Sequence, residues 1–144
     1  MPVKAGYSTP LLHVADVRRS IAFYELLGFE LIDDDGCAPP GWARIHCTGG
    51  ALMFLGAEEG SPPPRPVHDR FMLTMYTPDL PALRAQLVAA GVECTEIKRP
   101  PYMPGGELYL SDPDGYRIQL CHWSQVEDER WERHLEERKR KATS

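Results

Sequence analysis

Apolar and polar residues alternate along this chain with two different periods. In residues 17–27 the apolar side chains recur every three or four positions, which is the spacing of one face of a helix. In residues 42–47 they alternate with polar ones, as on a strand with one covered face. A second helical segment follows at residues 80–90. The pattern predicts strands at 7–14, 29–32, 42–47, 51–56, 70–76, 92–98, 107–110 and 115–121.

The two halves of the chain repeat one pattern. Asp16 and Asp79, which each suit the N-cap of a helix, are 63 residues apart. Gly28 and Gly91, which suit the ends of the same two helices, have the same offset. Each half therefore follows the order strand, helix and three strands, as two copies of one βαβββ unit would. Because one helix covers only one face of a small sheet, we expect the two units to pair around a cleft.

A proline-rich segment separates the two halves. Residues 58–68 hold several prolines, which cannot join the ladder of a sheet, and we expect a linker there. Residues 1–123 then form one domain with modules at about 7–57 and 69–122, and residues 124–144 form a helical extension. Ser124 and Glu127 fit a capping box, which predicts a helix from about residue 125 to 139. The predicted fold class is α+β: two βαβββ modules forming a curved mixed β-sheet around a cleft, plus a C-terminal helix.

Composition excludes several classes of function. A chain of 144 residues with 42% hydrophobic and 26% charged residues is typical of one globular domain. A net charge of -5 argues against a nucleic-acid partner, because phosphate binding requires a basic face. The absence of a long apolar run or signal-like segment leads us to expect a cytoplasmic protein with no membrane partner. The four cysteines form no CxxC pair, and we expect free thiols.

A polar side chain lies in the middle of the last predicted strand. Residues 112–115 (DPDG) predict a tight turn, with Gly115 at a position that tolerates positive φ. In the strand that follows, Gln119 shares a face with Arg117 inside a mostly apolar segment. Gln119 is therefore the first candidate for a functional side chain.

Three segments of the chain together resemble the vicinal oxygen chelate superfamily. They are LLHVADVRRSIAFYELLGFELI at 11–32, DLPALRAQLVAAGVE at 79–93 and SDPDGYRIQL at 111–120. This superfamily includes glyoxalase I, extradiol dioxygenases, fosfomycin-resistance enzymes and bleomycin-resistance proteins. The resemblance covers about residues 7–122 and includes the Phe23–Tyr24 pair, the helix-ending glycines and the DPDGY turn. It implies the paired βαβββ fold, a homodimer and a small-molecule ligand.

The resemblance also identifies four positions at which metal-dependent members carry their ligands. They lie seven residues before each helix-starting Asp and four residues after the glycine, Gly50 or Gly115, that opens the last strand of each half. The four positions hold Thr9, Phe54, Met72 and Gln119. Phenylalanine offers no donor atom and a thioether suits Cu(I) rather than a hard divalent ion, so only Gln119 is a plausible ligand. We expect no metal and no cofactor here.

The side chains expected to line the cleft are Thr9, His13, Trp42, Phe54, Met72, Tyr76, Tyr102 and Gln119. Each of His13 and Tyr76 is either a structural side chain on its sheet or a pocket-lining group. Trp42 either stacks on a ligand or covers the sheet. Tyr102 belongs to a loop that borders the cavity mouth in the superfamily. The alternative is that this loop is a rigid, solvent-exposed loop. Glu107 begins a strand, where we expect a solvated carboxylate.

Three functions remain open, and no catalytic residue is assigned. The first is a metal-independent protein that binds a small apolar or aromatic molecule, as bleomycin-resistance proteins do. The second is a lyase or dioxygenase of the glyoxalase type, with a metal placed differently or with His13 as a base. The third is a non-catalytic structural or regulatory dimer module whose cleft is filled by its own side chains.

Overall fold

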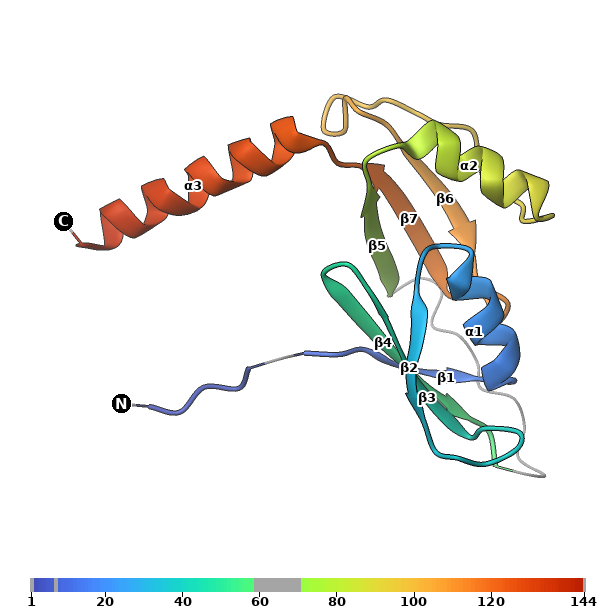
Figure 1. Ribbon diagram of the computed structural model, residues 1–144. Helices are drawn as coiled ribbons and strands as arrows, with labels where there is room; N and C mark the ends of the chain where they lie inside the picture. Colours follow the sequence, from blue (N-terminus) through green and yellow to red (C-terminus); the bar gives the residue numbers. More distant parts are fainter. Residues whose placement is uncertain (1, 7, 59–70, 144) are drawn as a thin grey trace. The chain divides into compact units, whose positions relative to one another are not determined.

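A computed structural model describes residues 2–6, 8–58 and 71–143 (Figure 1). It divides the chain into two compact units, Met1–Arg70 with Asp112–Tyr116, and Phe71–Ser111 with Arg117–Ser144. Each unit contains one sheet and one helix against it, and the second unit continues into a long C-terminal helix. The α+β fold class predicted from the sequence is confirmed. None of the described helices is both long and apolar enough to cross a membrane.

The first unit has a four-stranded sheet. Its elements are β1 (Leu11–Val14), α1 (Val17–Glu25), β2 (Glu30–Asp34), β3 (Trp42–Cys47) and β4 (Gly50–Gly56). The strand order is β1-β4-β3-β2, with β1 parallel to β4 and the other neighbours antiparallel. The predicted start of β1 at Tyr7 and most of the predicted linker 58–68 lie outside the described residues.

The second unit has a three-stranded sheet. Its elements are β5 (Met72–Thr77), α2 (Leu80–Ala89), β6 (Glu107–Ser111), β7 (Arg117–His122) and α3 (Gln125–Thr143). The strand order is β5-β7-β6, with β5 parallel to β7 and β6 antiparallel to it. The C-terminal helix begins where the capping box predicts and extends a turn further than expected.

One face of each sheet is buried under its own helix. In the first unit Leu12, Ile45 and Phe54 are buried on that face, and the Phe54 ring lies 5.3 Å from the ring of Tyr24 on α1. In the second unit the buried face consists of aliphatic side chains from all three strands, with two leucines from α2. They are Leu73, Leu108, Leu110, Ile118 and Leu120, with Leu80 and Leu87. The alternation seen in the sequence therefore gives each sheet one covered face.

The caps predicted for the first two helices are confirmed. The Asp16 carboxylate accepts hydrogen bonds from the first N–H groups of α1, including that of Arg18 at 3.0 Å. The Asp79 carboxylate accepts the N–H of Ala82 at 3.1 Å in α2. Gly28 follows α1 with a φ of 92°, in the region that favours glycine. All four cysteines are free thiols.

The segment predicted as a strand at 92–98 forms only isolated bridges. Cys94 pairs with Leu110 and Lys98 pairs with Glu107, but no continuous ladder joins them. Between these bridges, the N–H of Tyr109 donates to the side-chain hydroxyl of Thr95 at 2.9 Å rather than to a backbone carbonyl. A side chain that competes for a ladder donor in this way interrupts the strand.

The turn predicted at residues 112–115 is organised by a buried carboxylate. Asp112 Oδ1 accepts the N–H groups of Asp114 and Tyr116, both at 2.9 Å, and Gly115 has a φ of 88°. Asp112 Oδ2 accepts the hydroxyl of Tyr24 on α1 at 2.8 Å. Burial raises the pKa of Asp112, although these hydrogen bonds oppose the shift. The turn is therefore held to α1 by a side-chain bond that water does not replace.

We predict that Tyr24→Phe destabilises the protein by roughly 1–3 kcal/mol, because it removes a donor from a buried carboxylate without changing the shape of the ring. The free energy of unfolding from denaturant titration measures this loss. Tyr76→Phe is the matched control, since the Tyr76 side chain is more than half exposed, and we expect a change within about 0.5 kcal/mol. Equal losses in the two variants would contradict the role given to the Tyr24–Asp112 bond.

Candidate functional site

The second sheet presents three rows of side chains on the face opposite its buried aliphatic residues. Residues that are paired across neighbouring strands share a face, so the register of β5, β7 and β6 defines each row. The rows are Met72–Arg117–Ser111, Thr74–Gln119–Tyr109 and Tyr76–Cys121–Glu107. Gln119 therefore lies at the centre of this face, on the central strand. This face is the candidate functional site.

A hydrogen-bonded network fixes the polar side chains of the site. Glu107 Oε2 accepts the amide Nε2–H of Gln119 at 2.6 Å, and the hydroxyl of Thr74 donates to Gln119 Oε1 at 3.0 Å. Glu107 Oε1 accepts the hydroxyls of Tyr102 at 2.7 Å and Tyr109 at 3.3 Å. Gln119 thus has its amide oriented by a donor on one side and an acceptor on the other.

The environment of Glu107 corrects an expectation drawn from the sequence. A solvated strand-start carboxylate was expected, but only 3% of Glu107 is exposed. Its place in the register puts it on the same row as Cys121, and three neutral donors satisfy its two oxygens. A carboxylate can be buried when it is hydrogen-bonded in this way. The sequence did contain an indication of this: Glu107 and Tyr109 have the same parity on their strand, so Glu107 shares a face with Tyr109.

The Glu107 carboxylate changes the acidity of its neighbours. Its hydrogen bond with Tyr102, more than desolvation, raises the pKa of the Tyr102 phenol to about 12. Burial, with a smaller contribution from the charge of Glu107, raises the pKa of the Cys121 thiol to about 11. Both groups therefore remain protonated at neutral pH. The site offers hydrogen-bond donors beside one carboxylate rather than a thiolate nucleophile.

Two larger side chains flank this network with much of their surface accessible. Met72 is 41% exposed and Tyr76 is 56% exposed, although both are on the strand next to Gln119. The ring of Tyr76 also meets the ring of Trp123 edge-on, with centroids 5.0 Å apart. Of the eight side chains expected to line one cleft, Met72, Tyr76, Tyr102 and Gln119 thus lie on the second unit, at or beside this sheet face.

The uncovered face of the first sheet carries a second, separate set of the predicted residues. Thr9 accepts a hydrogen bond from the Arg44 guanidinium at 3.1 Å, and Arg44 also donates to Nε2 of His46 at 2.8 Å. His13 and Trp42 lie on this face too, because both pair in register with Leu55, which alternates with the buried positions of β4. Sequence reasoning missed the organising role of Arg44.

Phe54 does not reach an uncovered face, which corrects the predicted set. Its side chain is fully buried against Tyr24, and Met53 takes the uncovered face in its place. The error came from aligning Gly50 with Gly115 in the repeat. The glycine with the positive φ of 82° is Gly49, which corresponds to Gly115 at 88°. A shift of one residue in a strand moves a side chain to the opposite face.

The positions that correspond to metal ligands do not fit a divalent ion. After the correction they hold Thr9, Met53, Met72 and Gln119, which include two thioethers and no carboxylate or imidazole. The Thr9 hydroxyl already accepts from Arg44, and the Gln119 amide is held by Thr74 and Glu107. Within the described ranges, no three His, Cys, Asp or Glu side chains gather in a group that suits a metal.

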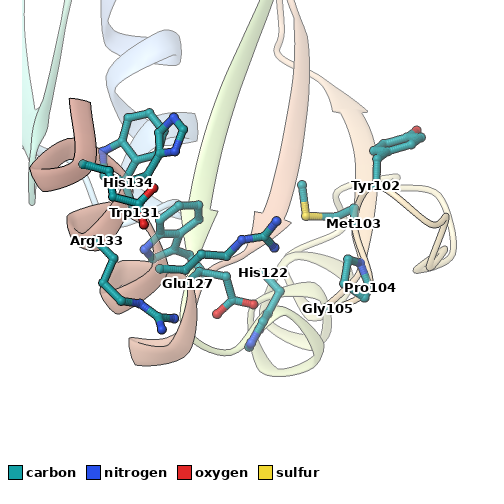
Figure 2. A pocket seen from close by; sticks show the side chains of 12 residues that line it. Tyr102, Met103, Pro104, Gly105, His122, Glu127, Trp131, Arg133 and His134 are labelled. Atoms are coloured by element: carbon teal, nitrogen blue, oxygen red, sulfur yellow. The ribbon is translucent and has the colours of Figure 1, made fainter. Parts of the chain in front are cut away.

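A groove of about 550 Å³ also lies in the second unit, between α3 and the loop before β6. Figure 2 shows Tyr102 and Met103 of that loop on one side and Trp131 and His134 of α3 on the other. The Trp131 and His134 rings stack with centroids 5.9 Å apart. The resemblance implied that this loop borders a cavity, with a rigid solvent loop as the alternative, but the sequence did not indicate that α3 would form the second wall.

We predict that Glu107→Gln lowers the pKa of Tyr102 from about 12 toward the ordinary value near 10, because the substitution removes the carboxylate that holds the phenol proton. Titration of the tyrosinate ultraviolet absorbance measures the shift, and Tyr102→Phe identifies which phenol moves. Glu96→Gln is the control, since Glu96 pairs with Arg84 and not with a tyrosine. An unchanged titration in Glu107→Gln would refute the Tyr102–Glu107 bond.

Comparisons with known proteins identify a family and several structures with a similar fold. The model of the Glyoxalase/Bleomycin resistance protein/Dioxygenase superfamily matches residues 7–120. The chain is similar to TnmS3, an antibiotic binding protein from Streptomyces sp. CB03234, with 26% identity, a TM-score of 0.61, and coverage of 85% of this chain and 100% of that chain. It also shares its fold with the bleomycin resistance determinant encoded on the transposon Tn5, at 23% identity and a TM-score of 0.61, covering 82% and 98%.

A third structural likeness is to an antibiotic resistance protein. The fosfomycin resistance protein FosX from Listeria monocytogenes has 16% identity and a TM-score of 0.66, with coverage of 87% of this chain and 98% of that chain. A comparison with curated proteins gives no match. Because the family model spans most of the sequence, the chain belongs to the Glyoxalase/Bleomycin resistance protein/Dioxygenase superfamily.

Proposed function

We propose that this protein binds a small apolar or aromatic molecule on the uncovered face of its second sheet, without a metal. The observation that carries the proposal is the fixed network of Thr74, Gln119 and Glu107 beside the accessible side chains of Met72 and Tyr76. Ligand sites are typically apolar and aromatic surfaces with a few oriented polar groups. Here the hydrogen bonds orient those polar groups before a ligand arrives, which reduces the entropy lost on binding.

The chemistry of the site favours binding over metal-assisted catalysis. A lyase or dioxygenase of the glyoxalase type would need oxygen or imidazole ligands that the four corresponding positions do not supply. The similarity to TnmS3, which is described as an antibiotic binding protein, supports the same choice. The accessible faces of Met72 and Tyr76 argue against the third reading, a module whose ligand surface is filled by its own side chains.

The remaining parts of the proposal concern the first sheet and the assembly. Thr9, His13 and Trp42 form a second surface of similar chemistry on the first unit, and we propose that they also contact ligand. A homodimer and a cytoplasmic location remain part of the proposal. A small-molecule ligand is the partner that the family and the site chemistry both favour.

We predict that the purified protein binds one or more members of a panel of bleomycin and planar aromatic molecules, and that a chelator leaves the binding unchanged. The thermal midpoint of unfolding is the readout, because a ligand that binds only the native state raises it in a concentration-dependent way. Elemental analysis of the same sample gives its metal content. Binding that appears only after a divalent ion is added would contradict metal independence, and no shift with any member would contradict the binding function.

For a ligand found in that panel, we predict that Tyr76→Ala or Met72→Ala weakens binding by roughly tenfold, since each removes accessible contact surface beside the polar network. Isothermal titration calorimetry measures the dissociation constants. Val88→Ala is the control, because Val88 is also exposed but lies on α2, the helix that covers the opposite face of the sheet. Equal effects of the three variants on the dissociation constant would show that the ligand binds elsewhere.

A further inference from the structure

The C-terminal helix α3 carries apolar side chains that its own unit leaves exposed. Trp131 is 54% exposed and Leu135 is 38% exposed, one turn apart on a helix of 19 residues. The start of the helix is well capped, because the Glu127 carboxylate accepts the backbone N–H of Ser124 at 2.8 Å and also its hydroxyl. No helix or strand in the described part of the unit packs extensively against α3. A polar helix of this length is normally stabilised by packing.

Four side chains of α3 form a stripe whose order of charges is asymmetric. An α-helix turns about 100° per residue, so Asp128, Trp131, Leu135 and Arg138 lie on one face. Along the helix this stripe runs acidic, apolar, apolar, basic. Read in the opposite direction it runs basic, apolar, apolar, acidic. The stripe is therefore complementary to itself when two copies are antiparallel, which is the arrangement that a two-fold axis produces.

The charge of the whole helix has the same asymmetry. Residues 127–134 carry four carboxylates against two arginines, whereas residues 135–143 carry four basic side chains against two glutamates. An antiparallel pair of α3 helices places each acidic half beside a basic half. A parallel pair places like charges together, which costs free energy.

We propose that α3 is a self-association element that pairs antiparallel with α3 of a second copy of this chain. Trp131 packs against the partner's Leu135, and Leu135 against the partner's Trp131. On either side of these contacts, Asp128 faces the partner's Arg138 and Arg138 faces the partner's Asp128. The partner's α3 thus covers the exposed stripe, and this pairing does not depend on the ligand-binding function proposed above.

The stripe is distinct from most of the groove described above. Trp131 borders both, but Asp128, Leu135 and Arg138 are not among the residues that line the groove. Asp128 Oδ1 accepts the indole N–H of Trp123, which ties the first turn of α3 to the end of β7. The contact between two single helices is small and its ion pairs are exposed, so the association is weak and becomes weaker at high salt.

Charge reversal in the full-length protein tests this arrangement. Sedimentation equilibrium at low ionic strength is expected to show a reversible association through α3, either of single chains or of the homodimers proposed above. Asp128→Arg and Arg138→Asp each place like charges together twice in a dimer, so each is expected to raise the dissociation constant about tenfold or more. An equimolar mixture of the two variants restores opposite charges at both contacts and is expected to associate as tightly as the unmodified chain.

Two controls separate pairing from general effects of charge. Glu136→Arg and Arg140→Asp make the same kinds of change away from the stripe, and we expect the dissociation constant to stay within about twofold. Circular dichroism checks that each variant keeps its helix. A chain that stays monomeric, an association that neither reversal weakens, or two helical variants whose mixture does not restore it would each overturn the proposal. None of these outcomes decides whether the sheet face binds a small molecule.

Discussion

Each sheet of this protein has one helix to cover it, and most other features follow from that constraint. The period of two along the strands sends aliphatic side chains to the helix and a mixed set to the other face. In the first unit the contact between Tyr24 and Phe54 closes the covered face, and in the second Leu80 and Leu87 do the same. The opposite face of the second sheet carries a mixed set, with Met72 and Tyr76 accessible and Glu107 and Cys121 buried.

Two buried carboxylates, Asp112 and Glu107, are hydrogen-bonded to neutral donors. Asp112 is satisfied by two backbone N–H groups and the Tyr24 hydroxyl, and Glu107 by Gln119 and two tyrosine hydroxyls. In both cases neutral donors replace water, which keeps the cost of burial low. Their positions separate their roles: Asp112 organises a turn, whereas Glu107 orients the polar groups of a sheet face.

Family membership and site chemistry answer different questions about this chain. The match over residues 7–120 accounts for the fold, and the structures that share this fold include an antibiotic binding protein and a fosfomycin resistance protein. The ligand positions hold two thioethers, a hydroxyl and an amide, which suit a divalent metal poorly and support the proposed metal-independent binding. The helix α3 lies beyond the family match, so its exposed Trp131 and Leu135 call for an explanation specific to this chain.

The sequence by itself determined the helices, their caps, most strands and the repeat, because these depend on local spacing and on residues such as Asp16, Asp79 and Gly28. Parity along one strand also placed Met72 and Tyr76 on one face, whereas Gln119 of another strand joined the same set through the resemblance to the superfamily. Only the tertiary structure decided that Phe54 turns inward and that Glu107 is buried. The first depended on which of two adjacent glycines adopts a positive φ, and the second on donors from a loop and two strands that are brought together only by folding.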